Sequence, residues 1–249
     1  MLAQTRTATT MAFRDQRRRP LVLILLVIVP AYVITQSIAE TLPTPRRIGL
    51  PGGGIVTTTM KDLHGAIMAG FVIAFVAALV GVFVMQSALQ GDRRLVAAGF
   101  RAGEAVAARI VVLLGATGLV VTVSLATTAV FFTPASWLPL SAALILTGLI
   151  YASIGALAGA ILDKLAATYL MLFLVITDLG IVQNPMFGSG VPGRWAALLP
   201  GYGPVRMMID GAFSQHFHAT PALLLTLAWI AALGLIVYLT LRRAVGVRA

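Results

Sequence analysis

Gln90 to Arg109 reads QGDRRLVAAGFRAGEAVAAR, a long arginine-rich interruption between two apolar runs that are each long enough to cross a membrane. Asp92 is placed to cap the N-terminus of a short helix with its carboxylate. Gly99 fits the left-handed position that follows a helix C-terminus. The residues between them make less than two turns, which is too short for a stable helix in water. The stretch therefore predicts a short helix that lies against another surface, or else a solvated loop that only orients the chain.

The composition is that of an integral membrane protein. The 249 residues are 59% hydrophobic and 10% charged, with a mean hydropathy of +0.96, whereas a soluble domain has about 25% charged residues. The absence of cysteine from the sequence excludes disulfides, thiolate metal sites and cysteine nucleophiles. We expect a single membrane domain over residues 1–249.

The apolar runs predict an all-α fold with six transmembrane helices, because a helix needs about 20 apolar residues to cross a bilayer. The first run follows a basic segment, residues 1–19, and Pro30 predicts a kink near its middle. A secretory signal is the alternative for this run, and its length favours an uncleaved span. The predicted spans are residues 20–38, 63–89, 110–132, 138–162, 165–183 and 221–241.

Two long segments rich in proline and glycine separate the spans. Residues 40–62 include Gly52, Gly53 and Gly54 and are predicted to be a loop. Residues 184–220 contain two apolar pieces, Trp195–Leu199 and Val205–Phe213, which are too short to cross a membrane. We expect these pieces to form half-buried helices that dip into the outer side of the bilayer.

Small residues in two of the spans predict close packing between helices. They are Gly70, Ala77, Ala78 and Gly81 in the second span, with Gly155 and Gly159 in the fourth. In a chain so rich in alanine and glycine, we interpret the Gly155–Gly159 pair as internal packing and not as a dimer seam.

The distribution of basic residues predicts the orientation. With six spans, 13 of the 18 Lys and Arg residues fall on the side of the two termini. Cytoplasmic loops carry such an excess, so both termini and the Gln90–Arg109 loop are expected in the cytoplasm. The net charge of +10 is explained by this distribution. It lacks the clustered lysines and aromatic platforms of a nucleic-acid surface, so no nucleic-acid partner is expected.

No constellation in the sequence indicates catalysis by this chain. A Gly-rich loop followed by Gly-Lys-Ser/Thr is missing, so the chain is not expected to bind ATP itself. Gly188-Ser189-Gly190 suggests an intramembrane serine nucleophile, but it lies between Pro185 and Pro192. The turn-forming tendency of these residues explains the sequence without catalysis. His216 and His218 do not share a helix face and have no acidic residue adjacent in sequence, so no metal site and no resident cofactor are expected.

Two acidic residues outside the cytoplasmic loop call for an explanation. Asp178 lies about two-thirds of the way along the fifth predicted span, where a buried acid is costly unless it is paired or faces water. It is either a group of the substrate path or a structural partner of Arg194, Arg206 or Asn184, and the structural reading is favoured. Arg206 and Asp210, spaced i and i+4, predict a local ion pair.

Several of these features occur together and in order. An Arg19-Pro20 start with Pro30 in the first span precedes the loop GDRRLVAAGFRAGEAVAAR, and LLPGYGPVRMMIDGAF (Leu198 to Phe213) follows the fifth span. In this order and spacing the chain resembles the permease subunit of type-2 ABC transporters, a class that includes drug, antibiotic and polysaccharide exporters. The resemblance covers essentially the whole chain, although each motif alone is diffuse.

The resemblance implies roles for particular segments. Asp92 to Ala98 would be the coupling helix, and an amphipathic segment at about residues 10–19 would also contact the ATPase. The outer re-entrant helices, about residues 195–213, would help to close the outer side. Family loops carry an acidic residue before the glycine and Gly-Thr after it, whereas Gln90-Gly91-Asp92-Arg93 stands here. The implied ATPase-coupling residues are Asp92, Arg93, Arg94, Leu95, Phe100 and Glu104, and the implied outer gate is Leu199, Pro200 and Tyr202.

The resemblance also implies the assembly. Two permeases, identical or paired with a sister subunit, would bind two separately encoded ATPases that hold ATP and Mg²⁺. The complex would export a hydrophobic or amphipathic molecule, such as a drug, antibiotic or lipid-linked molecule, across a bacterial-type plasma membrane. The alternatives are half of an ion-coupled secondary transporter, which should show charged relays near the midplane, and a membrane scaffold subunit without a transport path.

Overall fold

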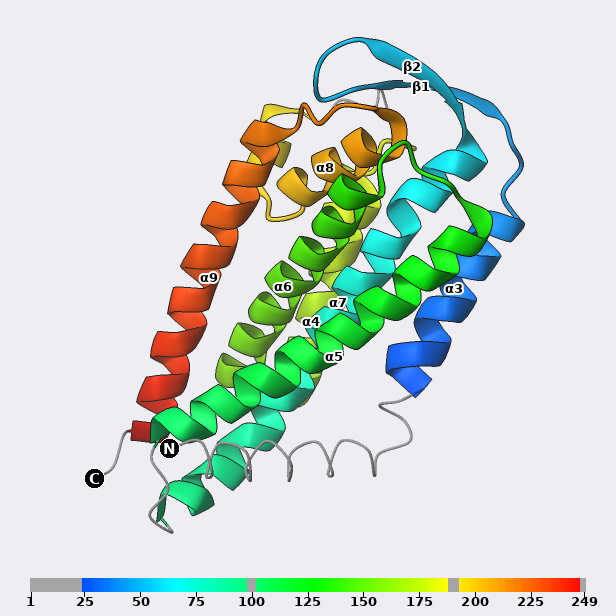
Figure 1. The fold of residues 1–249 in the computed structure, drawn as a ribbon. Helices are drawn as coiled ribbons and strands as arrows, with labels where there is room; N and C mark the ends of the chain where they lie inside the picture. The colour runs from blue at the N-terminus through cyan, green and yellow to red at the C-terminus, as the bar shows by residue number, and fades with distance from the viewer. Residues whose placement is uncertain (1–23, 98–101, 188–192, 247–249) are drawn as a thin grey trace.

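The computed structural model describes residues 24–97, 102–187 and 193–246 of the chain, and these form one helical bundle with a small β-hairpin at one end (Figure 1). The elements in chain order are η1 (Ile24–Ile28), α3 (Val29–Ala39), β1 (Pro45–Gly49), β2 (Ile55–Thr59), α4 (Met60–Ala97), α5 (Ala102–Phe131), α6 (Trp137–Ile161), α7 (Lys164–Val175), η2 (Ile176–Val182), η3 (Arg194–Leu198), α8 (Tyr202–Phe213) and α9 (Thr220–Gly246).

Within the described residues, five helical segments are long and apolar enough to cross a membrane, which indicates a multi-pass membrane protein. They agree within three residues with five of the predicted spans. The segments are Met60–Ser87, Ala107–Phe131, Trp137–Ile161, Lys164–Val182 and Thr220–Leu241.

The first predicted span is only partly within the described residues. Its described part is a shorter apolar helix, Ile24–Ala39, so a sixth crossing stays a prediction. Pro30 lies in the first turn of α3, directly after the π-helical segment η1. The regular helix therefore changes at the proline, as expected for a residue that lacks a backbone N–H.

The core of the bundle is the contact between α4 and α6, where glycines allow the two backbones to approach. A Cβ atom added to Gly159 would lie 2.7 Å from the carbonyl oxygen of Val82. Gly155 faces the backbone of Ala78 and Gly81 faces that of Ala152 even more closely. We call these contacts the α4–α6 seam. They confirm that the small residues of both helices serve packing within the chain.

Helix α7 has a clear start and an irregular end. The Asp163 side chain caps its N-terminus, because Oδ1 accepts hydrogen bonds from the backbone N–H groups of Leu165 and Ala166 at 2.9 and 3.0 Å. The helix continues as the π-helix η2, in which the N–H of Gln183 donates to the carbonyl of Asp178 at 2.8 Å. π-Helical turns are rare and occur frequently at functional sites.

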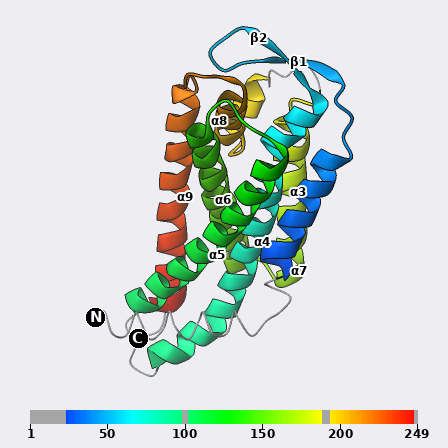
Figure 2. The same ribbon diagram turned by 45° about the vertical axis from the view of Figure 1, so that its right-hand side comes forward.

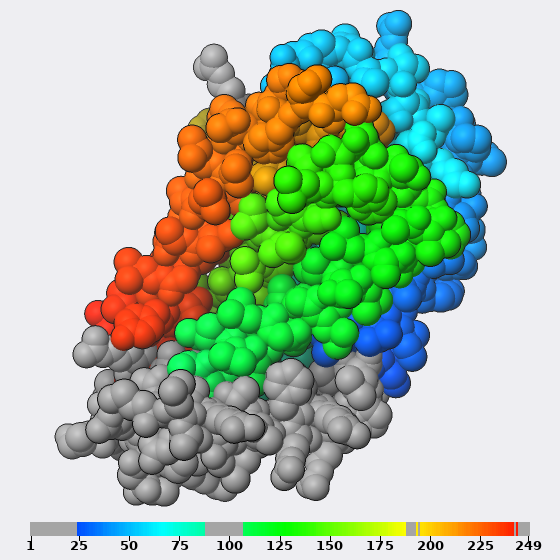
Figure 3. Space-filling model, viewed as in Figure 1, coloured from blue at the N-terminus to red at the C-terminus, as the bar shows by residue number. Residues whose placement is uncertain are grey.

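Residues 45–59 form a β-hairpin where the sequence predicted a loop. Strands β1 and β2 pair antiparallel, with Pro45 opposite Thr59 and Gly49 opposite Ile55. The turn uses positive φ angles at Gly53 (87°) and Gly54 (84°), which glycine adopts without steric cost. The all-α prediction is corrected by this element. Figure 3 shows the hairpin beside the start of α9 at one end of the bundle, which we call the hairpin end.

Helices η3 and α8 lie at the hairpin end, close to the two predicted pieces at 195–199 and 205–213. Helix α8 packs between α6 and α9, beneath the hairpin (Figure 2), and its residues Gly203–Ala212 are all buried. The predicted short helices are therefore present. Their re-entry into a bilayer stays a prediction.

Helix α4 is one continuous helix of 38 residues that runs from the hairpin end to Ala97. The predicted separate helix at Asp92 to Ala98 is wrong in this respect, because residues 92–97 form the last turns of α4. Asp92 consequently lies inside a helix and does not cap one. We call the opposite end of the bundle, where α4 ends and α5 begins, the loop end.

Candidate functional site

A buried carboxylate joins three separate elements near the hairpin end. Asp178, in η2, is 1% exposed. Its Oδ2 atom accepts a hydrogen bond from the hydroxyl of Tyr151 in α6 at 2.6 Å and another from the backbone N–H of Gly201 at 2.9 Å. We call Asp178, Tyr151 and Gly201 the Asp178 cluster.

The cluster leaves no room for a side chain at Gly201. A Cβ atom there would lie 2.6 Å from Leu179 Cδ2, 2.8 Å from the Tyr151 hydroxyl and 2.9 Å from Asp178 Oδ1. Glycine is therefore needed because the backbone approaches the carboxylate closely. Gly201 directly precedes α8, so the cluster fixes the start of α8 against the fifth and fourth spans.

A second hydrogen bond ties the end of η2 to η3. Gln183, 1% exposed, donates from Nε2 to the carbonyl of Ala196 at 2.8 Å. Asn184, which follows, is used locally, since its amide donates to the carbonyl of Gly180 and accepts from the N–H of Met186. The end of the fifth span and the segment before α8 are thus held together at two points.

Helix α8 is held at its C-terminal end as well. The N–H groups of Ala135 and Ser136, in the turn between α5 and α6, donate to the carbonyls of Ala212 and Gly211 at 3.0 and 2.8 Å. These bonds use carbonyls that a helix terminus leaves unpaired. A Cβ atom on Gly211 would lie 2.6 Å from the backbone nitrogen of Leu140. The α8 backbone therefore packs directly on α6.

Asp210 does not pair with Arg206, so the predicted ion pair is wrong. Its Oδ2 atom accepts from the N–H groups of His218 and Ala219 at 2.6 and 2.9 Å, immediately before α9. Arg206 is 9% exposed, and its Nη1 atom has no hydrogen-bond partner among the described residues. Helix spacing allowed the ion pair, but the backbone N–H groups of the α8–α9 connection take the carboxylate.

The histidines have an acidic neighbour that the sequence did not reveal. His218 Nδ1 lies 3.7 Å from Asp210 Oδ1, and its ring stands 6.5 Å from that of His216. A Cβ atom on Gly52, in the hairpin turn, would lie 2.7 Å from His218 Cγ. In the described part of the chain no group of three or more His, Asp or Glu side chains is arranged to hold a metal ion.

The structure brings together two sets of residues that the sequence analysis named separately. Leu199, Pro200 and Tyr202, the predicted outer gate, flank Gly201 and therefore adjoin Asp178, the predicted group of the substrate path. Pro200 is buried, whereas Leu199 and Tyr202 are half-buried. The structural partners predicted for Asp178 are wrong for Arg206 and Asn184, because Tyr151 and Gly201 bind it instead.

The predicted coupling residues lie at the loop end. Asp92, Arg93, Arg94 and Leu95 belong to the last turns of α4, and Glu104 belongs to the first turn of α5. Phe100 and the N-terminal segment at residues 10–19 lie outside the described residues. Coupling to an ATPase therefore stays a prediction for all of them.

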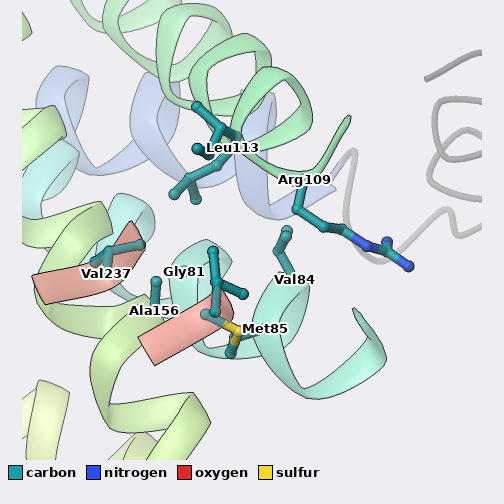
Figure 4. A pocket seen from close by; sticks show the side chains of 9 residues that line it. Gly81, Val84, Met85, Arg109, Leu113, Ala156 and Val237 are labelled. Atoms are coloured by element: carbon teal, nitrogen blue, oxygen red, sulfur yellow. The ribbon is translucent and has the colours of Figure 1, made fainter. Parts of the chain in front are cut away.

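A small apolar pocket opens near the loop end between α4, α5, α6 and α9 (Figure 4). Its volume is about 20 Å³, which is room for about one water molecule. Arg109 lies at its edge, with its guanidinium directed away from the pocket in Figure 4. The lining residues are Gly81, Val84, Met85, Arg109, Ile110, Leu113, Ala156, Val237 and Leu241.

Tyr151 and Gly201 are the residues of the cluster that the sequence analysis missed. A signal for Tyr151 was available, because a tyrosine inside a span needs a partner for its hydroxyl, and Asp178 is an acceptor in the next span. The signal for Gly201 was weak, since it lies in a segment that is generally rich in glycine.

The chain was compared with protein families, with curated proteins and with solved structures, and none of the three comparisons gives a match.

Proposed function

We propose that this chain is the transmembrane permease subunit of an ATP-driven exporter of the type-2 ABC class. It would move a hydrophobic or amphipathic molecule out of the cytoplasm or the inner leaflet, using a separately encoded ATPase. The observation that carries the proposal is the length of α4. This helix continues from its apolar segment Met60–Ser87 to Ala97 and places Asp92, Arg93 and Arg94 on an extension of the bundle core.

Such an extension suits a contact with a motor protein. Helix α4 is joined to α6 through the α4–α6 seam, so a displacement of its end would move both helices. The arginine excess of the loop end supports a cytoplasmic position for it. The hairpin end would then be the outer side, where α8 and the Asp178 cluster form the closure that has to loosen when the molecule leaves.

An ion-coupled secondary transporter is the second candidate, and Asp178 is the observation that favours it. A buried carboxylate within a span is a common proton or cation site. The Oδ1 atom of Asp178 has no hydrogen-bond partner among the described residues. However, its Oδ2 atom already accepts hydrogen bonds from Tyr151 and Gly201, which explains part of its burial without a transported ion. The ATP-driven reading is therefore preferred.

The test is reconstitution of the chain in liposomes with the ATPase encoded beside it. Hydrolysis of ATP is measured across a panel of hydrophobic drugs, together with the uptake of each drug into inside-out vesicles. The Arg93→Glu/Arg94→Glu variant should insert normally and lose drug-stimulated hydrolysis and uptake, because it reverses the charge of the α4 end that would contact the ATPase. The matched control is Arg46→Glu/Arg47→Glu, an exposed arginine pair in β1 at the opposite end.

Three outcomes would contradict the proposal, and two of them favour one of the alternative functions. Unchanged coupling in the Arg93→Glu/Arg94→Glu variant would remove the α4 extension from the mechanism. Uptake that follows an imposed proton gradient and ignores ATP would support the secondary transporter. A chain that binds the ATPase without any drug-dependent hydrolysis or uptake would support the scaffold.

A further inference from the structure

Three hydroxyl side chains on one face of α5 differ from the other hydroxyls of the spans. Thr117, Ser124 and Thr128 are 3%, 0% and 0% exposed. Their oxygen atoms have no hydrogen-bond partner among the described residues. Their spacing of seven and four residues places them along one side of the helix. We call them the hydroxyl stripe.

Most other serines and threonines of the spans are satisfied locally, and those that lack such a bond, including Ser141, Thr177 and Thr240, are not buried. Thr122 and Thr127, also in α5, donate to the carbonyls four residues earlier at 2.8 and 2.9 Å. The same bond is made in the other spans by Thr147, Ser153, Thr168 and Thr226. This back-bonding is the usual state of a hydroxyl in a helix within a membrane. The hydroxyl stripe is therefore an exception that is confined to one buried face.

The hydroxyl stripe faces the interior of the bundle. At Thr117, a Cβ atom added to Gly148 of α6 would lie 2.6 Å from Thr117 Cγ2 and 3.2 Å from Ile73 Cγ2 of α4. Helix α5 crosses α4 and α6 along its length in both views of the bundle (Figures 1 and 2). From Thr117 to Thr128 the stripe extends about 16 Å, roughly half of the ~30 Å hydrocarbon thickness.

We propose that the hydroxyl stripe lines a water-accessible path between α4, α5 and α6 during transport, and that it binds uncharged hydrogen-bonding groups of the transported molecule. A buried polar group without a partner is costly, and three of them on one face indicate a surface that is used when the helices separate. A hydroxyl both donates and accepts a hydrogen bond without charge. Between Thr117 and Thr128 the helix carries no charged residue, so alcohol and amide groups fit this path better than ions.

The absence of cysteine from the sequence makes the path directly testable. Single variants Thr117→Cys, Ser124→Cys and Thr128→Cys would be treated, in membranes of the producing cell, with a small charged methanethiosulfonate reagent. Two controls are Leu119→Cys, at an exposed position of the same helix (38%), and Val76→Cys, which is buried in α4 (0%). The three stripe variants should react about tenfold faster or more, because a thiol in apolar surroundings stays protonated and unreactive.

A second measurement tests the role of the hydroxyls, and it alone rests on the proposed function. Thr117→Val, Ser124→Ala and Thr128→Val remove the oxygen with little change in shape, so the melting temperature should stay equal or rise. ATP-dependent uptake of drugs that carry alcohol or amide groups should fall severalfold relative to Thr122→Val, a control whose hydroxyl is bonded locally.

The two measurements separate the possible failures. Stripe cysteines that react no faster than Leu119→Cys and Val76→Cys would overturn the path, whatever the chain transports. Fast labelling with full uptake in the Val and Ala variants would overturn binding by the hydroxyls. A wild-type chain without any ATP-dependent uptake would refute the proposed function, while the labelling would still decide whether the path exists.

Discussion

Helix α6 is held in two different ways, by the α4–α6 seam and by the Asp178 cluster. The seam is a contact between backbones at glycines, without polar side chains. The cluster is a set of directed hydrogen bonds from Tyr151 and Gly201 to one carboxylate. Apolar packing in a membrane depends on close fit, because lipid is as apolar as the helices. The packing of the seam is lost as a whole if the two backbones separate, whereas the two hydrogen bonds of the cluster can break separately.

This difference assigns the two regions different tasks. The seam suits a scaffold that moves as a unit, since any side chain inserted there would separate the helices. The cluster suits a closure, because a hydrogen bond within a membrane contributes only about 0.6 kcal/mol on average, which is small enough to be broken in each working cycle. The first three variants below test this assignment in order of decreasing effect, and the last, His218→Ala, concerns a contact outside both regions and is compared with Asp210→Ala.

The largest effect is expected for Gly155→Leu in the seam. The new side chain would meet the backbone of Ala78, which cannot move aside. Overpacking of a core commonly costs about 1–3 kcal/mol and sometimes more, and we expect the upper end of this range or a failure to fold. The monodisperse yield in detergent and the melting temperature measure it. Gly118→Leu is the control, because a Cβ atom there has no neighbour within 4 Å, and an equal loss in both variants would contradict the seam.

A smaller effect is expected for Gly201→Ala in the cluster. The added methyl group would meet side-chain atoms of Leu179, Tyr151 and Asp178, which can shift by rotation. We expect a loss of about 1–3 kcal/mol, seen as a lower melting temperature. Gly193→Ala provides the matched control, since its Cβ atom would have open space. If Gly201→Ala proved as stable as Gly193→Ala, the close approach would be refuted.

A still smaller effect is expected for Tyr151→Phe, which removes one hydrogen bond from the Asp178 carboxylate. We expect a loss of about 1 kcal/mol, and a coupling energy of at most about 2 kcal/mol in a double-mutant cycle with Asp178→Asn. Zero coupling would show that the two groups act independently.

Transport by Asp178→Asn tests whether Asp178 belongs to the substrate path. If the variant is expressed normally and transports every substrate unchanged, Asp178 is excluded from that path.

The smallest effect is expected for His218→Ala. The His218 side chain is half exposed, and its Nδ1 atom lies 3.7 Å from Oδ1 of the buried Asp210 side chain. This distance is too long for a hydrogen bond, so the loss should stay below about 1 kcal/mol. Asp210→Ala should cost more, about 1–3 kcal/mol, because it leaves two backbone N–H groups without their acceptor. Melting curves of the two variants compare them, and an equal loss would mean that the side-chain contact carries the interaction.

The sequence predicted the parts of the fold that depend on local pattern. Apolar length located the five long membrane segments, and small residues indicated which spans pack closely, although not that the second and fourth spans pack on each other. The β-hairpin was missed because prolines and glycines dominated residues 40–62, although Ile55 to Thr59 are all β-branched, a composition typical of strands. The continuity of α4 was missed because Gly91 and Asp92 resembled a helix boundary.

The candidate site was predicted only in part, since its contacts join residues that are distant in sequence. Tyr151 and Asp178 are 27 residues apart and lie on neighbouring spans, so their contact depends on how the helices are rotated against each other. For Asp210 the sequence predicted an ion pair with Arg206, one helical turn away. The carboxylate instead accepts hydrogen bonds from the backbone N–H groups of His218 and Ala219, eight and nine residues later. Such partners follow from three-dimensional packing, and a local spacing rule does not contain them.

The π-helix η2 has a consequence for how the fifth span can move. A π-helical turn holds an extra residue compared with an α-helix. The wider π-helical turns rotate each residue by less than the roughly 100° of an α-helix. A change of Ile176–Val182 to α-helical turns would therefore rotate Asp178 about the axis of the span relative to α7. The segment that carries the buried carboxylate is thus also the segment in which the fifth span can change its pitch.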